Sequence, residues 1–79
     1  MFMRDIKNVP YEELCNELRG KTVRFVSDCE LFHGFDVTGR VQRLDRSQYE
    51  TLIYVKTTSG KLLTIGSNMD KLRYQIIIS

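Results

Sequence analysis

The spacing of hydrophobic residues changes once along the chain, near residue 20. Before that point apolar side chains recur every three or four positions: Tyr11, Leu14, Cys15 and Leu18. This spacing predicts one amphipathic helix. Pro10 suits the first turn of a helix, and Gly20 suits the residue just past its end. We therefore expect a helix at about residues 10–19.

After residue 20 apolar residues alternate with polar ones, which is typical of strands with one buried face. Strands are predicted at residues 22–27, 35–44, 51–57, 62–65 and 72–78. A turn at residues 45–48, a hairpin connection at 59–60 and a single helical turn at 66–70 link the later strands. In the last strand one alternate set is apolar throughout and is predicted to face inward: Leu72, Tyr74, Ile76 and Ile78.

Gly39 lies inside the predicted strand 35–44, with Val37 and Val41 on one face and Thr38, Arg40 and Gln42 on the other. An interior glycine permits a bulge or a sharp bend. One helix and five short strands without helical crossovers predict a mainly β fold. We expect a single domain over residues 1–79, with an N-terminal α-helix followed by a five-stranded, strongly bent antiparallel small barrel at about residues 21–78.

Three short motifs resemble those of the Sm-like family. Gly39, Val41, Asp45 and Leu52 match the spacing of its first signature, a glycine, an apolar residue, an aspartate and a leucine at offsets 0, 2, 6 and 13. Residues 64–69 are similar to its second signature, and residues 18–23 to its helix-to-strand entry. The resemblance implies a helix on a bent five-stranded barrel, assembly into rings and RNA binding. A Src-homology-3-like barrel with an added helix fits the same features.

The chain departs from that family where the family contacts RNA. The base-stacking aromatic position is Ser47, the uridine-binding asparagine corresponds to Tyr49, and the arginine corresponds to Ile65. Without these groups, base recognition by that pocket has no obvious chemical basis. Any function is therefore expected on another surface.

Charge is distributed unevenly. The whole chain carries +2, whereas residues 21–79 hold nine basic and six acidic side chains and so carry +3. This mild excess is compatible with nucleic acid or another acidic partner. No apolar run is long enough to span a membrane or to act as a secretory signal, so we expect a cytoplasmic protein. Cys15 and Cys29 are interpreted as small apolar residues.

The alternation places Arg24, Arg40, Gln42, Lys56 and Arg73 on outward strand faces, with Tyr54 among them, and Arg43 is added to this set as a candidate contact residue. Basic side chains with an interleaved aromatic suit phosphate contact and base stacking. The first hypothesis is thus a non-enzymatic protein that binds single-stranded RNA or DNA weakly through these residues. The alternative interpretation is an ordinary solvated sheet face.

The loop at residues 28–36 mixes chemistry-bearing and apolar side chains. It holds Cys29 and His33, but it lacks the repeated ligand pairs of a metal site and the third group that orients a catalytic pair. We expect no metal, no cofactor and no catalysis. Leu31, Phe32 and Phe35 either fold back on the barrel or meet a partner. The second hypothesis is therefore a protein-interaction module, an adaptor or an inhibitor, that uses this loop.

The end of the chain, residues 76–78, is three isoleucines in a row. Such a strand has an edge that aggregates when it is exposed. Either the barrel closes over it, or it pairs with a second copy of the chain in a homo-oligomer.

Overall fold

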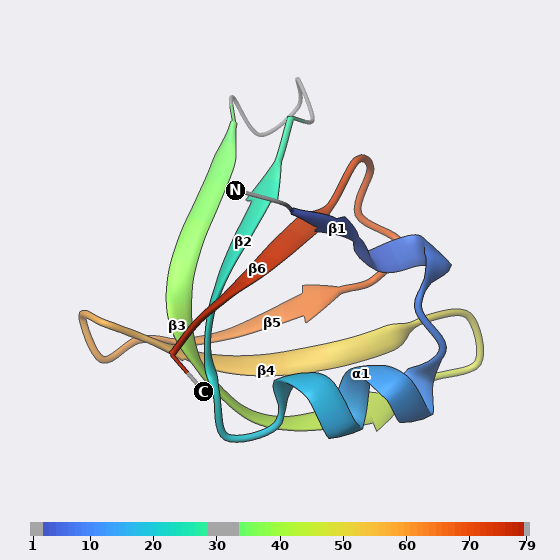
Figure 1. Ribbon diagram of the computed structural model, residues 1–79, viewed down its shortest axis with the longest axis horizontal. Helices are drawn as coiled ribbons and strands as arrows, with labels where there is room; N and C mark the ends of the chain where they lie inside the picture. The colour runs from blue at the N-terminus through green and yellow to red at the C-terminus, as the bar shows by residue number, and fades with distance from the viewer. Residues whose placement is uncertain (1–2, 29–33, 79) are drawn as a thin grey trace.

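The structure, a computed structural model, describes residues 3–28 and 34–78, and its main element is one antiparallel sheet (Figure 1). The six strands lie side by side in the order β1-β6-β2-β3-β4-β5. Their bounds are β1 (Arg4–Asp5), β2 (Thr22–Ser27), β3 (Phe35–Arg46), β4 (Thr51–Thr57), β5 (Leu62–Gly66) and β6 (Arg73–Ile78). The helical elements are a short 3-10 helix, η1 (Ile6–Asn8), and α1 (Tyr11–Leu18).

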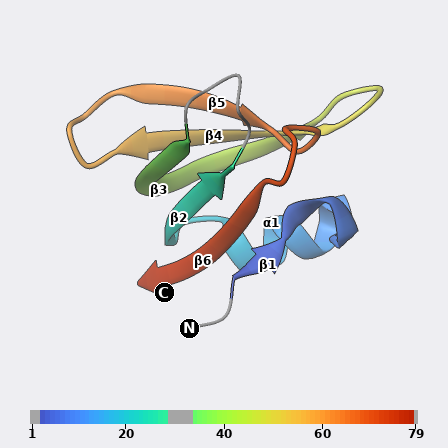
Figure 2. The ribbon, with the colours of Figure 1, turned by 90° about the horizontal axis from the view of Figure 1, so that it is seen from above.

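The long strand β3 belongs to both halves of the sheet. Its first half pairs with β2, from Phe35 to Arg40, and its second half pairs with β4, from Gly39 to Arg46. Figures 1 and 2 show the consequence: β2 and β6 run across the direction of β4 and β5, and β3 curves from one pair to the other. The sheet is therefore strongly bent, with a concave face between its two halves.

Gly39 lies at the centre of this curve. A Cβ atom at this position would lie 2.5 Å from the backbone oxygen of Lys56 and 2.6 Å from Cγ1 of Val55. The two strands can approach this closely only because residue 39 has no side chain. The interior glycine of the sequence is thus explained by close strand contact at the bend.

A β-bulge interrupts β3 three residues further on. Val41 pairs with Val55 and Arg43 pairs with Tyr54, so Gln42 is the extra residue between them. A bulge shifts the alternation of side chains by one position. Val41 and Leu44 are consequently both buried, although they are three residues apart.

Helix α1 lies against the concave face and contacts both halves of the sheet. Leu14 and Leu18 are fully buried in the core. On one side the Tyr11 hydroxyl donates a hydrogen bond of 3.2 Å to the backbone oxygen of Leu44 in β3. On the other side Arg4 of β1 donates to carboxylates of the helix, at 2.9 Å to Glu13 and 3.1 Å to Glu17.

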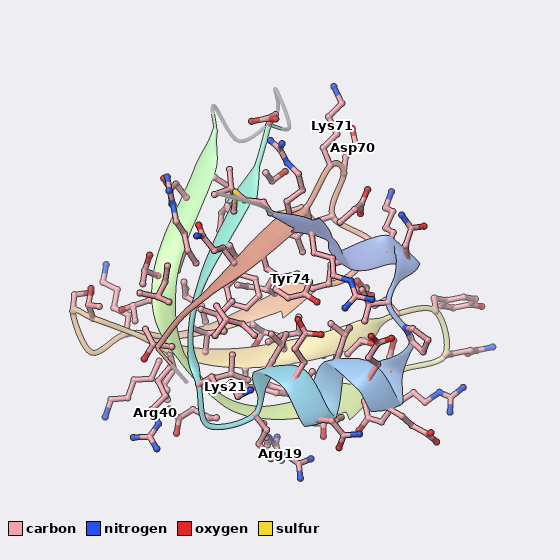
Figure 3. All side chains as sticks on the ribbon, in the orientation of Figure 1. Arg19, Lys21, Arg40, Asp70, Lys71 and Tyr74 are labelled. Atoms are coloured by element: carbon pink, nitrogen blue, oxygen red, sulfur yellow. The ribbon has the colours of Figure 1, made fainter. Side chains whose placement is uncertain are left out.

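The core fills the space between the helix and the sheet. Its buried hydrophobic residues are Ile6, Val9, Leu14, Leu18, Val23, Phe25, Val41, Leu44, Ile53, Val55, Ile65, Leu72 and Tyr74. Tyr74 is only 2% exposed and lies in the interior of the molecule (Figure 3). Its burial and its hydrogen bond to Glu17 raise the pKa of the phenol to about 12. This buried phenol fixes β6 to the helix.

Most predicted elements are confirmed. The helix, the strands at residues 22–27 and 51–57, and the inward positions of Leu72, Tyr74 and Ile76 are found where the periodicity placed them. The side chain of Ile78, the fourth residue of that predicted set, lies outside the described part of the chain. The mainly β fold with an N-terminal helix is likewise confirmed. Periodicity succeeded here because these segments each bury one regular face.

The predicted closed barrel is not found. The sheet has six strands rather than five, and its edge strands β1 and β5 do not pair with each other within residues 3–28 and 34–78. The additional strand explains part of the difference, because Arg4 and Asp5 pair with Tyr74 and Arg73 on the side of β6 that faces away from β2. The predicted helical turn at residues 66–70 was also wrong: Ser67 to Lys71 form tight turns, and Lys71 has a positive φ of 55°.

Candidate functional site

The outer face of the sheet carries one row of side chains across four strands. Thr22 pairs with Arg40, Arg40 with Lys56, and Lys56 with Leu62. Directly paired residues of antiparallel strands lie on the same face, with Cβ atoms about 4.5 to 5.5 Å apart. Their neighbours Val23, Val41 and Val55 are buried, so this row points outward. Arg40 and Lys56 thus extend outward from directly opposed positions on adjacent strands.

The row borders a groove of about 510 Å³ that we call the basic groove. Its cations are Arg19, Arg40 and Lys56, and hydroxyl groups come from Thr22, Thr57 and Thr58. In Figure 3 Arg19 and Arg40 both project from the lower margin of the molecule, Arg19 from the end of α1 and Arg40 from β3. The groove therefore gathers positive charge from the helix end and from two strands.

No acidic side chain lines the basic groove among the residues that the structure describes. Arg19, Arg40 and Lys56 also form no ion pair with any described carboxylate. Like charges directly opposite each other across two strands are destabilising. A cationic pair of this kind stabilises the protein only when an anion lies between or over its members.

Backbone hydrogen bonds hold the helix end beside β3. The Gly20 nitrogen donates to the oxygen of Val41 at 3.0 Å, and the Val41 nitrogen donates to the oxygen of Lys21 at 2.9 Å. Gly20 has a φ of 76°, the left-handed conformation that glycine adopts readily. The tight turn after α1 thus places Arg19 and Arg40 along the same groove, although the two residues are far apart in the sequence.

Two of the predicted contact residues are held by carboxylates elsewhere. Arg24 donates to both oxygens of Asp36, at 3.0 and 2.7 Å, and this pairing lowers the pKa of the Asp36 carboxyl. Arg73 donates to Asp28 at 2.6 Å. Neither arginine lines the basic groove. The structure therefore separates Arg24 and Arg73 from Arg40 and Lys56.

Arg43 and Tyr54 form a second row on the same outer face. They are paired in register, and the Arg43 guanidinium lies 4.5 Å from the centre of the Tyr54 ring. Arg43 also lies 3.4 Å from a carboxylate oxygen of Asp45. Both side chains line a second groove, of about 290 Å³, which adjoins the basic groove through Gln42.

The predicted protein-interaction loop lies only partly within the described residues. Leu31 and Phe32 lie outside the described residues, together with Cys29 and His33. Phe35 is partly buried and packs against the core, so it is held by the fold. Elsewhere in the described chain no three potential metal-ligating side chains cluster. The hypothesis of a binding loop stays a prediction.

The three positions that correspond to the RNA contacts of the Sm-like family lie in the core or at a turn. Ile65 is buried in the core. The Ser47 hydroxyl donates to the Glu50 backbone oxygen at 2.8 Å and accepts from the Glu50 nitrogen at 3.0 Å, which closes a turn. Tyr49 is 79% exposed at this turn. These positions and the basic groove share no residue.

Arg19 and Leu62 are site residues that sequence reasoning missed, whereas Gln42 was predicted as an outward residue but not as a contact residue. Arg19 was assigned only to the helix end, and Leu62 only to a strand. The Arg-Gly pair after the helix was the one available signal, because a glycine there turns the chain sharply. Their proximity to Arg40 depends on strand pairing, which single-sequence periodicity does not give.

Comparisons with protein-family models, with curated proteins and with solved structures found no match. The resemblance to the Sm-like family therefore rests on the three motifs. Within the described part of the chain, no helix has the length and apolar character needed to cross a membrane.

Proposed function

We propose that this protein binds single-stranded nucleic acid, with the sugar-phosphate backbone seated in the basic groove. The observation that carries the proposal is the direct pairing of Arg40 with Lys56 beside Arg19, in a groove whose described lining has no carboxylate. Phosphate oxygens accept hydrogen bonds from guanidinium and ammonium groups, and the contact releases counterions. The ligand thus supplies the negative charge that this groove lacks.

An extended single strand suits this surface better than a duplex. The outer face presents strand side chains, with threonine hydroxyls beside the cations. Sheet surfaces that combine backbone contacts with an aromatic residue bind unpaired strands. No group in the basic groove is arranged for catalysis, so the proposed activity is binding alone.

The test is the salt dependence of binding to a fluorescent single strand of about ten nucleotides. Three cations predict a slope of about −2 when the logarithm of the association constant is plotted against the logarithm of the salt concentration. Alanine at Arg19, Arg40 or Lys56 should weaken binding and make the slope shallower by about 0.7. Absence of binding at low salt would sink the proposal.

Arg24→Ala and Arg73→Ala are the matched controls. Each removes one exposed positive charge from the same sheet, but each guanidinium is already bound by a carboxylate outside the basic groove. Binding by these variants should equal that of the unmodified protein. An equal loss at all five positions would mean that net charge alone attracts the strand, and the groove would then have no special role.

A further inference from the structure

The second groove has the chemistry of a site for an unpaired base. It is lined by the Arg43–Tyr54 pair, by Leu62 of the edge strand and by the polar side chains Gln42 and Thr64. We name it the base groove. Leu62 is 75% exposed and lines this groove with an apolar side chain. An apolar wall, a stacking plane and a few polar groups are what a flat heterocycle requires.

The two grooves are neighbours on one surface. Gln42, the bulge residue, lines both of them. Leu62 of the base groove is paired in register with Lys56 of the basic groove. On β4, Tyr54 and Lys56 are two residues apart and point outward, which separates their Cα atoms by about 7 Å. A phosphate at Lys56 and a base at Tyr54 therefore belong to adjoining parts of one strand of nucleic acid.

Gln42 is placed to contact the edge of that base. Its side-chain nitrogen donates to the backbone oxygen of Arg40 at 3.2 Å, which holds the amide on the outer face. An amide offers both an acceptor and a donor, and its second N–H is still available. The Thr64 hydroxyl lies in the same groove, on the other side of Tyr54 in the row Arg43–Tyr54–Thr64.

We infer that the base groove takes one unpaired nucleobase of the strand whose phosphates occupy the basic groove. The base stacks on the Arg43–Tyr54 pair and against Leu62, and Gln42 contacts its polar edge. The inference rests on the proposed function and adds a site at which the protein distinguishes a nucleic acid from any other polyanion.

An abasic oligonucleotide separates the two claims. It keeps every phosphate and sugar of the intact strand and lacks only the bases. We expect the intact strand to bind about tenfold more tightly than the abasic strand, since stacking one base on an aromatic side chain is worth about that factor or more. Leu62→Ser should reduce the affinity for the intact strand and leave the affinity for the abasic strand unchanged. Gln42→Ala, whose side chain lines both grooves, should reduce the affinity for the intact strand more than the affinity for the abasic strand.

Two further variants make the result decisive. Arg40→Ala should weaken binding of both strands alike. Ile77→Ser, which removes an exposed apolar side chain from β6, should affect neither. Equal affinity for intact and abasic strands, or an unchanged preference in Leu62→Ser, overturns the base groove and leaves the proposed function standing. If neither the intact nor the abasic strand binds at low salt, both the base groove and the proposed function are overturned.

Discussion

The Tyr74 hydroxyl donates a hydrogen bond of 3.0 Å to a carboxylate oxygen of Glu17, which joins the last strand to the helix. Glu17 also accepts from Arg4 of β1 at 3.1 Å. The helix is therefore fixed by residues from both ends of the chain. Since Arg19 follows this helix directly, the same contacts help to determine where one side of the basic groove lies.

The first prediction concerns the stability of this contact at high pH. The unfolded chain loses the Tyr74 proton near pH 10, whereas the folded protein retains it until about pH 12. Between these values the unfolded state binds fewer protons, so the free energy of unfolding falls as pH rises. Below pH 10 the contribution is complete. Urea denaturation from pH 8 to 12 should show this loss.

Tyr74→Phe is the control for that measurement, because other tyrosines and the lysines titrate in the same range. The variant should be less stable at pH 8 by about 1 to 3 kcal/mol, the cost of a lost hydrogen bond to a charged group. The difference in the free energy of unfolding between the variant and the unmodified protein should shrink above pH 10. A difference that stays constant to pH 12 would show that the phenol is not held protonated by the fold.

The second prediction concerns the bend at Gly39. Gly39→Ala introduces a Cβ atom 2.5 Å from the Lys56 backbone oxygen, and a backbone atom within the sheet cannot move away cheaply. We expect a loss of about 1 to 3 kcal/mol, as for other overpacked sites. Thr64→Ala, on the exposed face of β5, should change stability little. Thermal unfolding that is equal for both variants would contradict the close strand contact.

The third prediction concerns the unneutralised charge of the basic groove. Arg40→Gln relieves the repulsion with Lys56, worth about 0.2 to 1 kcal/mol. At low salt the variant should therefore melt about 1 to 5 °C higher than the unmodified protein. The difference should shrink as added salt screens the pair. A lower melting temperature at low salt would show that Arg40 contributes to stability rather than opposing it.

The fourth prediction concerns the open edges of the sheet. Among the described residues β5 pairs only with β4, and β6 pairs with β1 only at Arg73 and Tyr74. Ile77 is 47% exposed near the end of β6. Such edges pair readily with further strands, so we expect a homo-oligomer in light scattering. Ile77→Lys should lower the mass. A monomeric mass at all concentrations would contradict edge pairing.

The sequence predicted those parts of the fold that bury a regular face. The helical stripe of Leu14 and Leu18, and the alternation of Val23 and Phe25, follow from a fixed period. The strand β1 was missed because a two-residue segment has no period. Its existence depends on the distant partners Tyr74 and Arg73.

The site was predicted less well because it depends on which charged side chains form ion pairs and which do not. Arg24 pairs with Thr38 in the register, and its carboxylate partner Asp36 is a diagonal neighbour two residues away. Spacing along one strand shows none of this. Arg40 and Lys56 were predicted correctly as outward residues, but only the register shows that they are directly opposed.

The bulge at Gln42 also determines how the protein tolerates change. Arg40 and Arg43 are three positions apart and would occupy opposite faces of a regular strand; the extra residue lets both reach the outer face. Deleting Gln42 would turn the end of β3 over, bringing Arg43 inward and Leu44 into water. A one-codon deletion here would thus remove the stacking residue and expose the core in the same event, so this strand can vary by substitution but not in length.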